Sequence, residues 1–524
     1  MHESRRAFLW RAGVLAAPLL LSRSLGAEAS ARFNVRDHGA RGDGRAKDTP
    51  AIQAAIDAAA RSGGTVSFPP GNYVSGTLRL RSRVTLRLDA GATVLASPDS
   101  GDFDPPEELG YETFTDRETA DFTYALLQGR RVAHVRILGP GRIDGRGTSR
   151  GGPKPIALKE CRDIQIRDLT IANAPNYNIS LLGCDHVEIL GVTILNGYSD
   201  GIDPDCCRNV RIARCHIETR DDAVVLKASF ALGVRRATEN VMVSDCHLVT
   251  RHNALKLGTE STGDFRRIFM GDCTIVGQRH PWKGDLSSGI ALQAVDGGAL
   301  EHVAVSDIRM TDVFAPIFVR LARRGRAQAV RTAGVLRDVS ISNVVATGAS
   351  GTSSITGIPG HPVERISLQN VRVTAVGGGK AELVSLEMPD MERLYPDATM
   401  FGDLPAYGLY CRHVVGLKVN GIDVSVAQPD ARPAVVLGQV RDVDLRAMRA
   451  MPPADGGPTL WLHSVQDGLV RDLRSHASDP PVVRVSGAAS SGIRVLGASN
   501  AAVNRPTVVI DGDVLATALQ GSSK

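Results

Sequence analysis

Residues 161–183 read CRDIQIRDLTIANAPNYNISLLG, and the next two blocks repeat the pattern as CDHVEILGVTILNGYSDGIDPDC (184–206) and CRNVRIARCHIETRDDAVVLKAS (207–229). Each 23-residue block begins with a cysteine, continues as an alternating strand-like segment and ends in a second apolar run. Repeats of 20–50 residues indicate a solenoid or a propeller. Because short strand-forming segments follow one another with almost no helical sequence between them, we predict an all-β, single-stranded right-handed parallel β-helix.

The repeat extends in both directions from these blocks. It returns as ENVMVSDCHLVTRHNALKLG (239–258) and continues to VVGLKVNGIDVSV (414–426). Near the start, Thr49 and Pro50 suit a helix N-terminus, and Ile52 and Ile56 lie four apart on one apolar face. We expect this helix to close the N-terminal end of the solenoid, as terminal caps of repeat proteins do.

We divide the chain into an N-terminal signal segment, 1–29, and one catalytic domain, 30–524. Within the domain, we expect the cap and first coils over 30–100, the coils that carry the active site over 101–440, and C-terminal coils with a tail over 441–524. A domain of this length is too large for one globular core but suits an elongated repeat fold.

The first 29 residues resemble an export signal. Two arginines in SRRAFL (4–9) precede a short apolar run and an A-x-A site at 27–29. This pattern is typical of a bacterial twin-arginine signal, with an ordinary secretory leader as the alternative. We therefore expect a periplasmic or extracellular protein with no membrane partner, and a net charge of +5 is too balanced to favour nucleic acid.

The cysteines are expected to stack rather than pair. The chain has eight of them and no C-x-x-C pair, and Cys161, Cys184 and Cys207 open successive blocks. Equivalent residues of successive coils form ladders, so these three thiols should line one ladder in the core. Disulfides remain the alternative, because export permits them.

Three acidic residues fall in register when the coils are aligned on the small and apolar residues after each polar stretch. Asp200, Asp222 and Asn253 then occupy one slot on three successive coils, and Ser199, Asp221 and His252 occupy the neighbouring slot. Neighbouring strand residues point to opposite faces, so the Asp221–Asp222 pair needs a bend in the chain. When carboxyl groups lie close together, the pKa of one of them rises. The cluster can then hold a protonated and an ionised carboxyl group at the same pH, as acid–base catalysis requires.

Parts of this sequence resemble two known groups of proteins. The segment 33–76 resembles the N-terminal region shared by the pectate-lyase-like superfamily. The order YSDGID (198–203), RDDAVVLK (220–227) and HNALKLGTES (252–261) resembles glycoside hydrolase family 28, the polygalacturonases and rhamnogalacturonan hydrolases. That resemblance implies inverting hydrolysis of glycosidic bonds in pectin without a metal. It also implies Asp221 as general acid, with Asp200 and Asp222 activating the water.

The sequence departs from the family pattern around these acids. Tyr198 and Ser199 replace the expected Asn and Thr, and Asn253 replaces the expected His, with His252 one residue earlier. The family's Arg-Ile-Lys motif should fall on 291–293, which reads ALQ, so both cations are missing and plain polygalacturonan is disfavoured as substrate. The candidate substrate contacts are Tyr198, His252, Asn253, Lys256, Trp282 and Arg320.

The sequence also allows roles other than substrate binding for several of these residues. Lys256 and Arg320 occupy the missing cation positions one coil early and one coil late, but such side chains are usually solvated. The Trp282 ring either stacks against a sugar of the substrate or is buried and holds the inserted segment against the coils. The Pro-rich segment 387–410, which is unlike a coil, is expected to wall the active site and to limit the enzyme to chain ends.

The sequence thus predicts an exported, monomeric glycosidase that acts on pectic polysaccharide or oligosaccharide and needs no cofactor or metal. A polysaccharide lyase or epimerase on the same fold is an alternative, in which the three aspartates hold Ca²⁺ and Lys227 or Lys256 is the base. A carbohydrate-binding β-helix that has lost its chemistry is the third reading.

Overall fold

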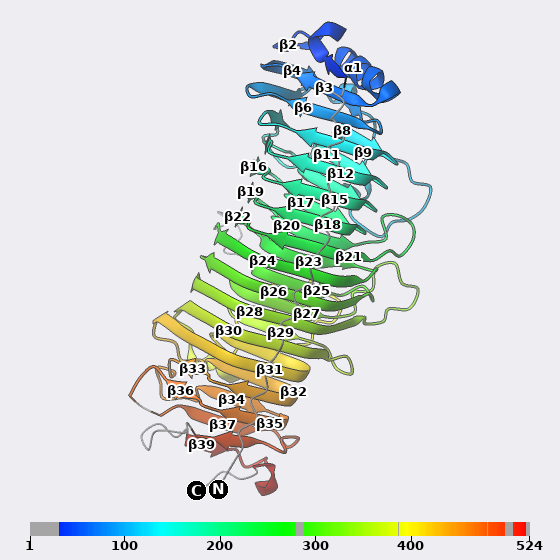
Figure 1. Ribbon diagram of the computed structural model, residues 1–524. Helices are drawn as coiled ribbons and strands as arrows, with labels where there is room; N and C mark the ends of the chain where they lie inside the picture. Colours follow the sequence, from blue (N-terminus) through cyan, green and yellow to red (C-terminus); the bar gives the residue numbers. More distant parts are fainter. Residues whose placement is uncertain (1–30, 279–287, 386, 479, 498–506, 520–524) are drawn as a thin grey trace, which may run out of the picture.

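The computed structural model describes residues 31–278, 288–385, 387–478, 480–497 and 507–519. The predicted export signal and Trp282 lie outside these residues. The described strands form an elongated stack in which every neighbouring pair of main strands is parallel, and Figure 1 shows the coils following one another from end to end. This is the predicted all-β parallel β-helix.

The first coil has two strands, so β1 pairs with β3 and β2 with β4. From β3 to β20, three strands make up each coil, and strand n pairs with strand n+3. Ile156 pairs with Ile179 and Ile179 with Ile202, which confirms the 23-residue repeat. The three resulting stacks are called ladders 1, 2 and 3 in chain order within a coil.

Ladder 1 contains β1 Arg32–Asn34, β3 Gly64–Phe68, β6 Val84–Leu88, β9 Ala133–Leu138, β12 Arg162–Arg167, β15 Asp185–Leu190, β18 Arg208–Ala213 and β21 Thr238–Ser244. Ladder 2 contains β2 Asp43–Lys47, β4 Gly71–Ser75, β7 Ala92–Ala96, β10 Arg142–Asp144, β13 Thr170–Ala172, β16 Thr193–Gly197, β19 His216–Thr219 and β22 His247–Thr250. Ladder 3 contains β5 Leu78–Arg79, β8 Ala125–Arg130, β11 Lys154–Lys159, β14 Ile179–Leu182, β17 Ile202–Asp205, β20 Val224–Ala228, β23 Asn253–Ser261, β25 Ser288–Ala294, β27 Ala315–Leu321 and β29 Ser353–Thr356.

Ladders 1 and 2 merge in the later coils, where single long strands serve both. These strands are β24 Phe265–Gly277, β26 Ala299–Thr311, β28 Val335–Ala349 and β30 Val363–Gly377. Strand β31 Leu409–Gln428 begins in ladder 3 and continues through ladders 1 and 2, and β32 Val435–Arg446 serves ladder 3 and then ladder 1. The last coils return to short strands: β33 Arg449–Ala450, β34 Leu460–His463, β35 Gln466–Arg471, β36 Arg474–Ser475, β37 Val482–Ser486, β38 Arg494–Leu496 and β39 Thr507–Ile510.

Alternation along the strands places the apolar side chains inside the coil. In β12, Ile164 and Ile166 are buried between outward-facing polar neighbours, as a half-exposed strand requires. The same positions of β15 and β18 are also buried and apolar, so one continuous core runs along the axis.

Helix α1, Thr49–Ser62, covers the N-terminal end of the solenoid (Figure 1). Ile52 and Ile56 are fully buried on its inner face, as expected. The N-cap is Asp48 rather than Thr49, whose hydroxyl instead accepts from Gly76 N at 2.9 Å. The Asp48 carboxylate accepts from the backbone of Arg41 and Gly42 at 2.7 and 3.1 Å, which fixes the preceding turn.

The remaining helices are short and lie in the connections: η1 Val35–His38, η2 Ser100–Asp102, α2 Arg117–Ala120, η3 Ala381–Ser385 and η4 Ala516–Ala518. Within the described ranges, no helix has the length and apolar character needed to cross a bilayer.

All eight cysteines are buried and free, which confirms stacked thiols over disulfides. Cys207 Sγ accepts from the backbone N of Cys184 at 3.3 Å, so successive members of the predicted ladder are in contact. A second series of buried cysteines, Cys215, Cys246 and Cys273, begins on the same coil as Cys207 and continues on the next two coils.

Candidate active site

The three aspartates lie in the turns that join ladder 2 to ladder 3. Ile202 pairs with Val224, and Val224 pairs with Leu255, so the residues two positions earlier are Asp200, Asp222 and Asn253. This confirms the predicted register of the coils. Equivalent residues on adjacent rungs lie about 4.8 Å apart, which brings these side chains into one cluster.

Asp222 is buried between cations and donors. Lys256 Nζ lies 2.7 Å from Asp222 Oδ2, and His252 Nδ1 lies 2.8 Å from Oδ1. Asn253 donates to Oδ1 from its side chain at 2.7 Å and from its backbone at 3.1 Å. Burial alone would raise the pKa of Asp222, but Lys256 and His252 outweigh it and hold that pKa well below the usual range. This carboxyl group is therefore ionised in the free protein.

Asp200 has the opposite electrostatic surroundings. Its side chain is also buried, and Lys227 Nζ lies 3.1 Å from Oδ2 but only 2.6 Å from the neighbouring Asp203. Burial raises the pKa of Asp200 well above the usual range, and the charges of Asp221 and Asp222 raise it further, although Lys227 opposes this. The cluster therefore holds one ionised carboxyl group and one that favours its proton.

Asp221 is the most accessible of the three. Its side chain is 22% exposed, against 5% for Asp200 and Asp222. Its Oδ1 lies 3.4 Å from His252 Nδ1, and its Oδ2 accepts from Arg150 Nη1. Asp221 is thus the carboxyl group that a substrate can reach most easily, once Arg150 moves aside.

A wall segment, residues 387–408, lies against this cluster. Asp397 Oδ2 is 3.1 Å from His252 Nε2, and Gln293 Nε2 donates to Pro396 O at 3.4 Å. Tyr395 places its ring 6.0 Å from Lys256 Nζ. The Pro-rich segment therefore does flank the site, as the sequence indicated.

The other predicted substrate contacts are placed differently. Tyr198 is half-buried, with the Arg220 guanidinium 3.9 Å above its ring. Arg320 falls opposite Gln293, as predicted, but its guanidinium is buried and donates to Gly357 O at 3.1 Å and to Asp390 O. Burial lowers the pKa of Arg320 to about 10. This placement does not support a substrate contact by Arg320, and that role stays a prediction.

Four residues of the site were not predicted from the sequence: Glu118, Arg150, Asp203 and Asp397. Glu118, Arg150 and Asp397 come from segments outside the repeat, so no ladder alignment could place them. Asp203 lies in β17, three residues after Asp200, and Lys227 bridges the two. Lys227 is a weak sequence signal for Asp203. It lies within a strand that is expected to be buried, and a buried lysine requires carboxylate partners.

A metal ion could bind only at one described group in this region. Asp221, Asp222 and His252 offer ligand atoms within 4.8 Å of one another. Asp222, Asp397 and Asp221 raise the pKa of His252 well above the ordinary value, although burial opposes them. A metal ion would therefore have to displace the proton of His252 before this imidazole could serve as a ligand.

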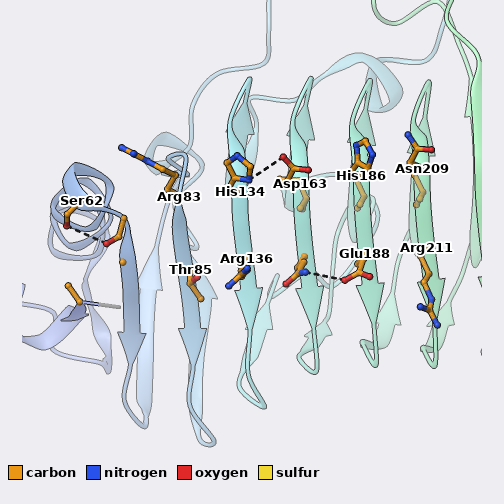
Figure 2. A pocket seen from close by; sticks show the side chains of 17 residues that line it. Ser62, Arg83, Thr85, His134, Arg136, Asp163, His186, Glu188, Asn209 and Arg211 are labelled. Carbon is orange, nitrogen blue, oxygen red and sulfur yellow. Dashed lines mark hydrogen bonds and ion pairs between the residues drawn. The ribbon is translucent and has the colours of Figure 1, made fainter. Parts of the chain in front are cut away.

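A second concave surface lies away from the aspartates. It measures about 890 Å³ and extends over β6, β9, β12, β15 and β18 of ladder 1 (Figure 2). His134 pairs there with Asp163 at 3.3 Å, and Gln165 donates to Glu188 at 3.2 Å. These are solvated rows of side chains with no buried carboxyl group, so the aspartate cluster is the stronger candidate for the active site.

Comparisons with known proteins agree on a family. The family model described as glycosyl hydrolases family 28 matches residues 108–389, and one described as rhamnogalacturonase A/epimerase, pectate lyase-like, matches residues 32–100. A probable polygalacturonase of Vitis vinifera is 26% identical over 399 residues, which cover 69% of this chain and 78% of that protein. A polygalacturonase of Ralstonia solanacearum is 27% identical over 338 residues, which cover 52% of this chain and 61% of that protein.

Two solved structures share the fold. The family 28 exopolygalacturonase of Yersinia enterocolitica matches with a TM-score of 0.60 at 17% identity, over 82% of this chain and 79% of that one. The hyperthermoactive exopolygalacturonase of Thermotoga maritima matches with a TM-score of 0.57 at 20% identity, over 75% and 92%.

Proposed function

Because the chain belongs to glycosyl hydrolase family 28, we propose that it hydrolyses glycosidic bonds in an acidic pectic polysaccharide or oligosaccharide at the Asp200–Asp221–Asp222 cluster. One observation carries this assignment. The accessible Asp221 lies beside two buried carboxyl groups, Asp200 and Asp222, and Lys256 and His252 hold Asp222 ionised. Glycoside hydrolysis needs one carboxyl group that reaches the glycosidic oxygen as an acid and an ionised carboxylate that activates water on the opposite side of the scissile bond.

We assign the roles by exposure and charge. Asp221 is the general acid, because it alone among the three is accessible enough to reach a glycosidic oxygen. Asp222 is the base that activates water, because Lys256 and His252 keep it ionised. Asp200, held by Lys227, orients that water through a hydrogen bond. Inversion at the anomeric carbon follows if the water attacks from the side opposite Asp221.

The substrate class follows from the missing cations and the wall. Ala291 pairs with Lys256, and Gln293 with Arg320, so the motif positions for arginine and lysine are uncharged. This favours rhamnogalacturonan or a modified pectin over plain polygalacturonan. The wall segment closes the region beside His252, which supports attack at chain ends; several of the relatives are named as exo-acting enzymes. We further propose that the protein acts outside the cytoplasm.

The decisive experiment compares Asp221→Asn with wild type. Mature protein is incubated with homogalacturonan, rhamnogalacturonan and xylogalacturonan, and the products and their anomeric configuration are read by NMR. We expect cleavage of one acidic substrate with inversion, and at least about a hundredfold loss of kcat in Asp221→Asn. The exposed Asp442 supplies the control variant Asp442→Asn, which should be fully active. A retained anomer, or an active Asp221→Asn, would overturn the mechanism.

The lyase and epimerase reading has less support. Lys227 and Lys256 are both buried in ion pairs with carboxylates, which raise the pKa of each well above the usual value against the effect of burial. Neither is a free base for proton abstraction. Unsaturated product that absorbs in the ultraviolet, with its release abolished by EDTA, would favour the lyase. Binding of a pectic substrate without release of any product would favour the third hypothesis, a carbohydrate-binding β-helix without catalytic activity.

A further inference from the structure

The cations near the aspartates differ in what else they can bind. Lys227 and Lys256 are buried, and their ammonium groups contact Asp200, Asp203 and Asp222. The Arg320 guanidinium is buried against backbone carbonyls. Arg150 is the exception among the described cations that contact the cluster, because its side chain is 48% exposed.

The backbone around Arg150 holds it over the cluster. Arg150 lies between β10 and β11, in a segment fastened to the turn of the next coil. Gly147 N donates to Asn173 O and Gly151 N to Pro175 O, both at 2.8 Å. Asn176 Nδ2 donates to Gly152 O at 3.0 Å. The segment on both sides of Arg150 is therefore fixed, while the guanidinium itself faces solvent.

Two carboxylates share this guanidinium. Glu118 of α2 accepts from Arg150 Nε at 3.2 Å and from Nη2 at 2.5 Å, which orients the planar group from one edge. The remaining nitrogen, Nη1, donates to Asp221 Oδ2. While this contact exists, the oxygen of the proposed acid that faces solvent is occupied.

We propose that Arg150 binds the carboxylate of a uronic acid residue of the substrate, next to the scissile bond. The substrate carboxylate takes the place of Asp221 on Nη1, and the exchange frees Asp221 Oδ2, which takes up a proton from water once the cation has left it and then meets the glycosidic oxygen as an acid. One carboxylate replaces another, so the guanidinium keeps its charge-assisted hydrogen bonds throughout. A neutral or esterified sugar has no carboxylate to replace Asp221 on Arg150, so Arg150 stays bound to Asp221.

This assignment rests on the proposed function and explains how the chain recognises acid without the cations of the family motif. Arginine suits the role, because its planar fork matches a carboxylate and remains charged at every relevant pH. Selectivity and chemistry are then coupled, since the group that recognises the acidic sugar is the group that covers the catalytic acid.

The test compares Arg150→Gln with a matched variant, Arg146→Gln, on the same segment; the Arg146 side chain is exposed. Each is assayed on oligosaccharides of the acidic pectic substrate that the wild type cleaves, with free carboxylates and as methyl esters. Arg150→Gln should lose about ten- to a hundredfold in kcat/KM on the free acids, the value of one charge-assisted hydrogen bond. Its kcat/KM on the esters should not fall, and Arg146→Gln should behave as wild type on both.

Binding measurements separate this inference from the proposed function. The binding of the same free-acid oligosaccharide is measured by calorimetric titration in an Asp222→Asn background. Arg150→Gln should weaken this binding about ten- to a hundredfold, and Arg150→Lys should recover part of the loss. Equal losses on free and esterified oligomers, or no loss, would overturn the role of Arg150. A wild-type protein that binds the free acid through Arg150 but cleaves no pectic substrate would overturn the proposed function alone.

Discussion

Asp222 sits between two cations, and their combined charge decides its protonation state. A carboxyl group buried alone would hold its proton. Lys256 at 2.7 Å and His252 at 2.8 Å reverse that preference, and Asn253 adds two hydrogen bonds to Oδ1. The histidine that the family pattern places at position 253 is thus replaced by a pair, in which Asn253 and His252 contact the same carboxylate oxygen.

Replacing Lys256 by methionine should change the pH profile of hydrolysis. Asp222 has a depressed pKa, so it stays ionised as the pH falls, and its contribution to stability is lost only when the pH falls through that depressed value. Without Lys256 the pKa of Asp222 rises, so the acidic limb of the kcat/KM profile should move upward by about one to three pH units.

The measurement is the pH dependence of kcat/KM between about pH 3 and pH 8, with the unfolding temperature followed in parallel. Lys418→Met, at an exposed position of β31, is the control and should leave the profile unchanged. An unaltered acidic limb in a folded Lys256→Met variant would contradict the role of Lys256.

The wall segment is attached to the site through a titratable contact. His252 Nε2 lies 3.1 Å from Asp397 Oδ2, and the carboxylates of Asp222, Asp397 and Asp221 raise the pKa of His252 above its ordinary value, although burial opposes them. A raised pKa means that the contribution of this contact is complete below about pH 6.5 and is lost as the pH rises through the higher value in the folded protein.

The protection of amide hydrogens against exchange in residues 387–408 should therefore depend on pH, in addition to the intrinsic effect of pH on the exchange rate. After correction for intrinsic rates, protection should fall roughly tenfold between neutral and alkaline pH, as expected for one charge-assisted hydrogen bond. In His252→Gln the corrected protection should be lower and independent of pH. Strand β28 reports global stability and should not change; a parallel loss there would show general unfolding instead of release of the wall.

Helix α1 protects the first coil of the solenoid. Ile56 is fully buried beneath it, and truncation to alanine should cost about 2–5 kcal/mol. Because repeat folds lose stability locally, we expect the cap to open before the later coils unfold and to expose strand edges that pair between molecules. Light scattering during slow heating should show earlier aggregation for Ile56→Ala than for Arg61→Ala, an exposed position of the same helix. Identical onset temperatures would contradict the capping role.

The repeat explains which features of the protein could be predicted from its sequence. Alignment of the coils placed Asp200, Asp222 and Asn253 in one row, because the same small and apolar residues follow each of these positions. The same alignment paired Gln293 with Arg320 correctly but could not show that Asp390 and Gly357 enclose the guanidinium. Arg150, Glu118 and Asp397 belong to segments between the strands, whose paths are set by tertiary contacts and carry no periodic signal.

At the scale of the whole molecule, stability comes from one long core rather than from cross-links. Most of the buried apolar side chains belong to one continuous cluster that extends from the cap to the last coils and includes both cysteine series. Each coil is held by its two neighbours through parallel strand pairing, so the thiols serve as small apolar residues. Burial also raises the pKa of Cys184 and Cys411 well above the ordinary value for a thiol, which suppresses the reactive thiolate.

The thiol content tests this account of the molecule. All eight cysteines are free and buried, so the native mature protein should show no thiol that reacts rapidly with Ellman's reagent, and eight should react after denaturation without reductant. The unfolding temperature should be the same with and without reductant, because no covalent link restricts the unfolded chain. Fewer than eight thiols in the denatured, unreduced protein, together with destabilisation by reductant, would show disulfides and contradict the stacked-thiol core. Rapid reaction of one or more thiols in the native state would instead show that the coils open locally, which the continuous packing along the axis should prevent.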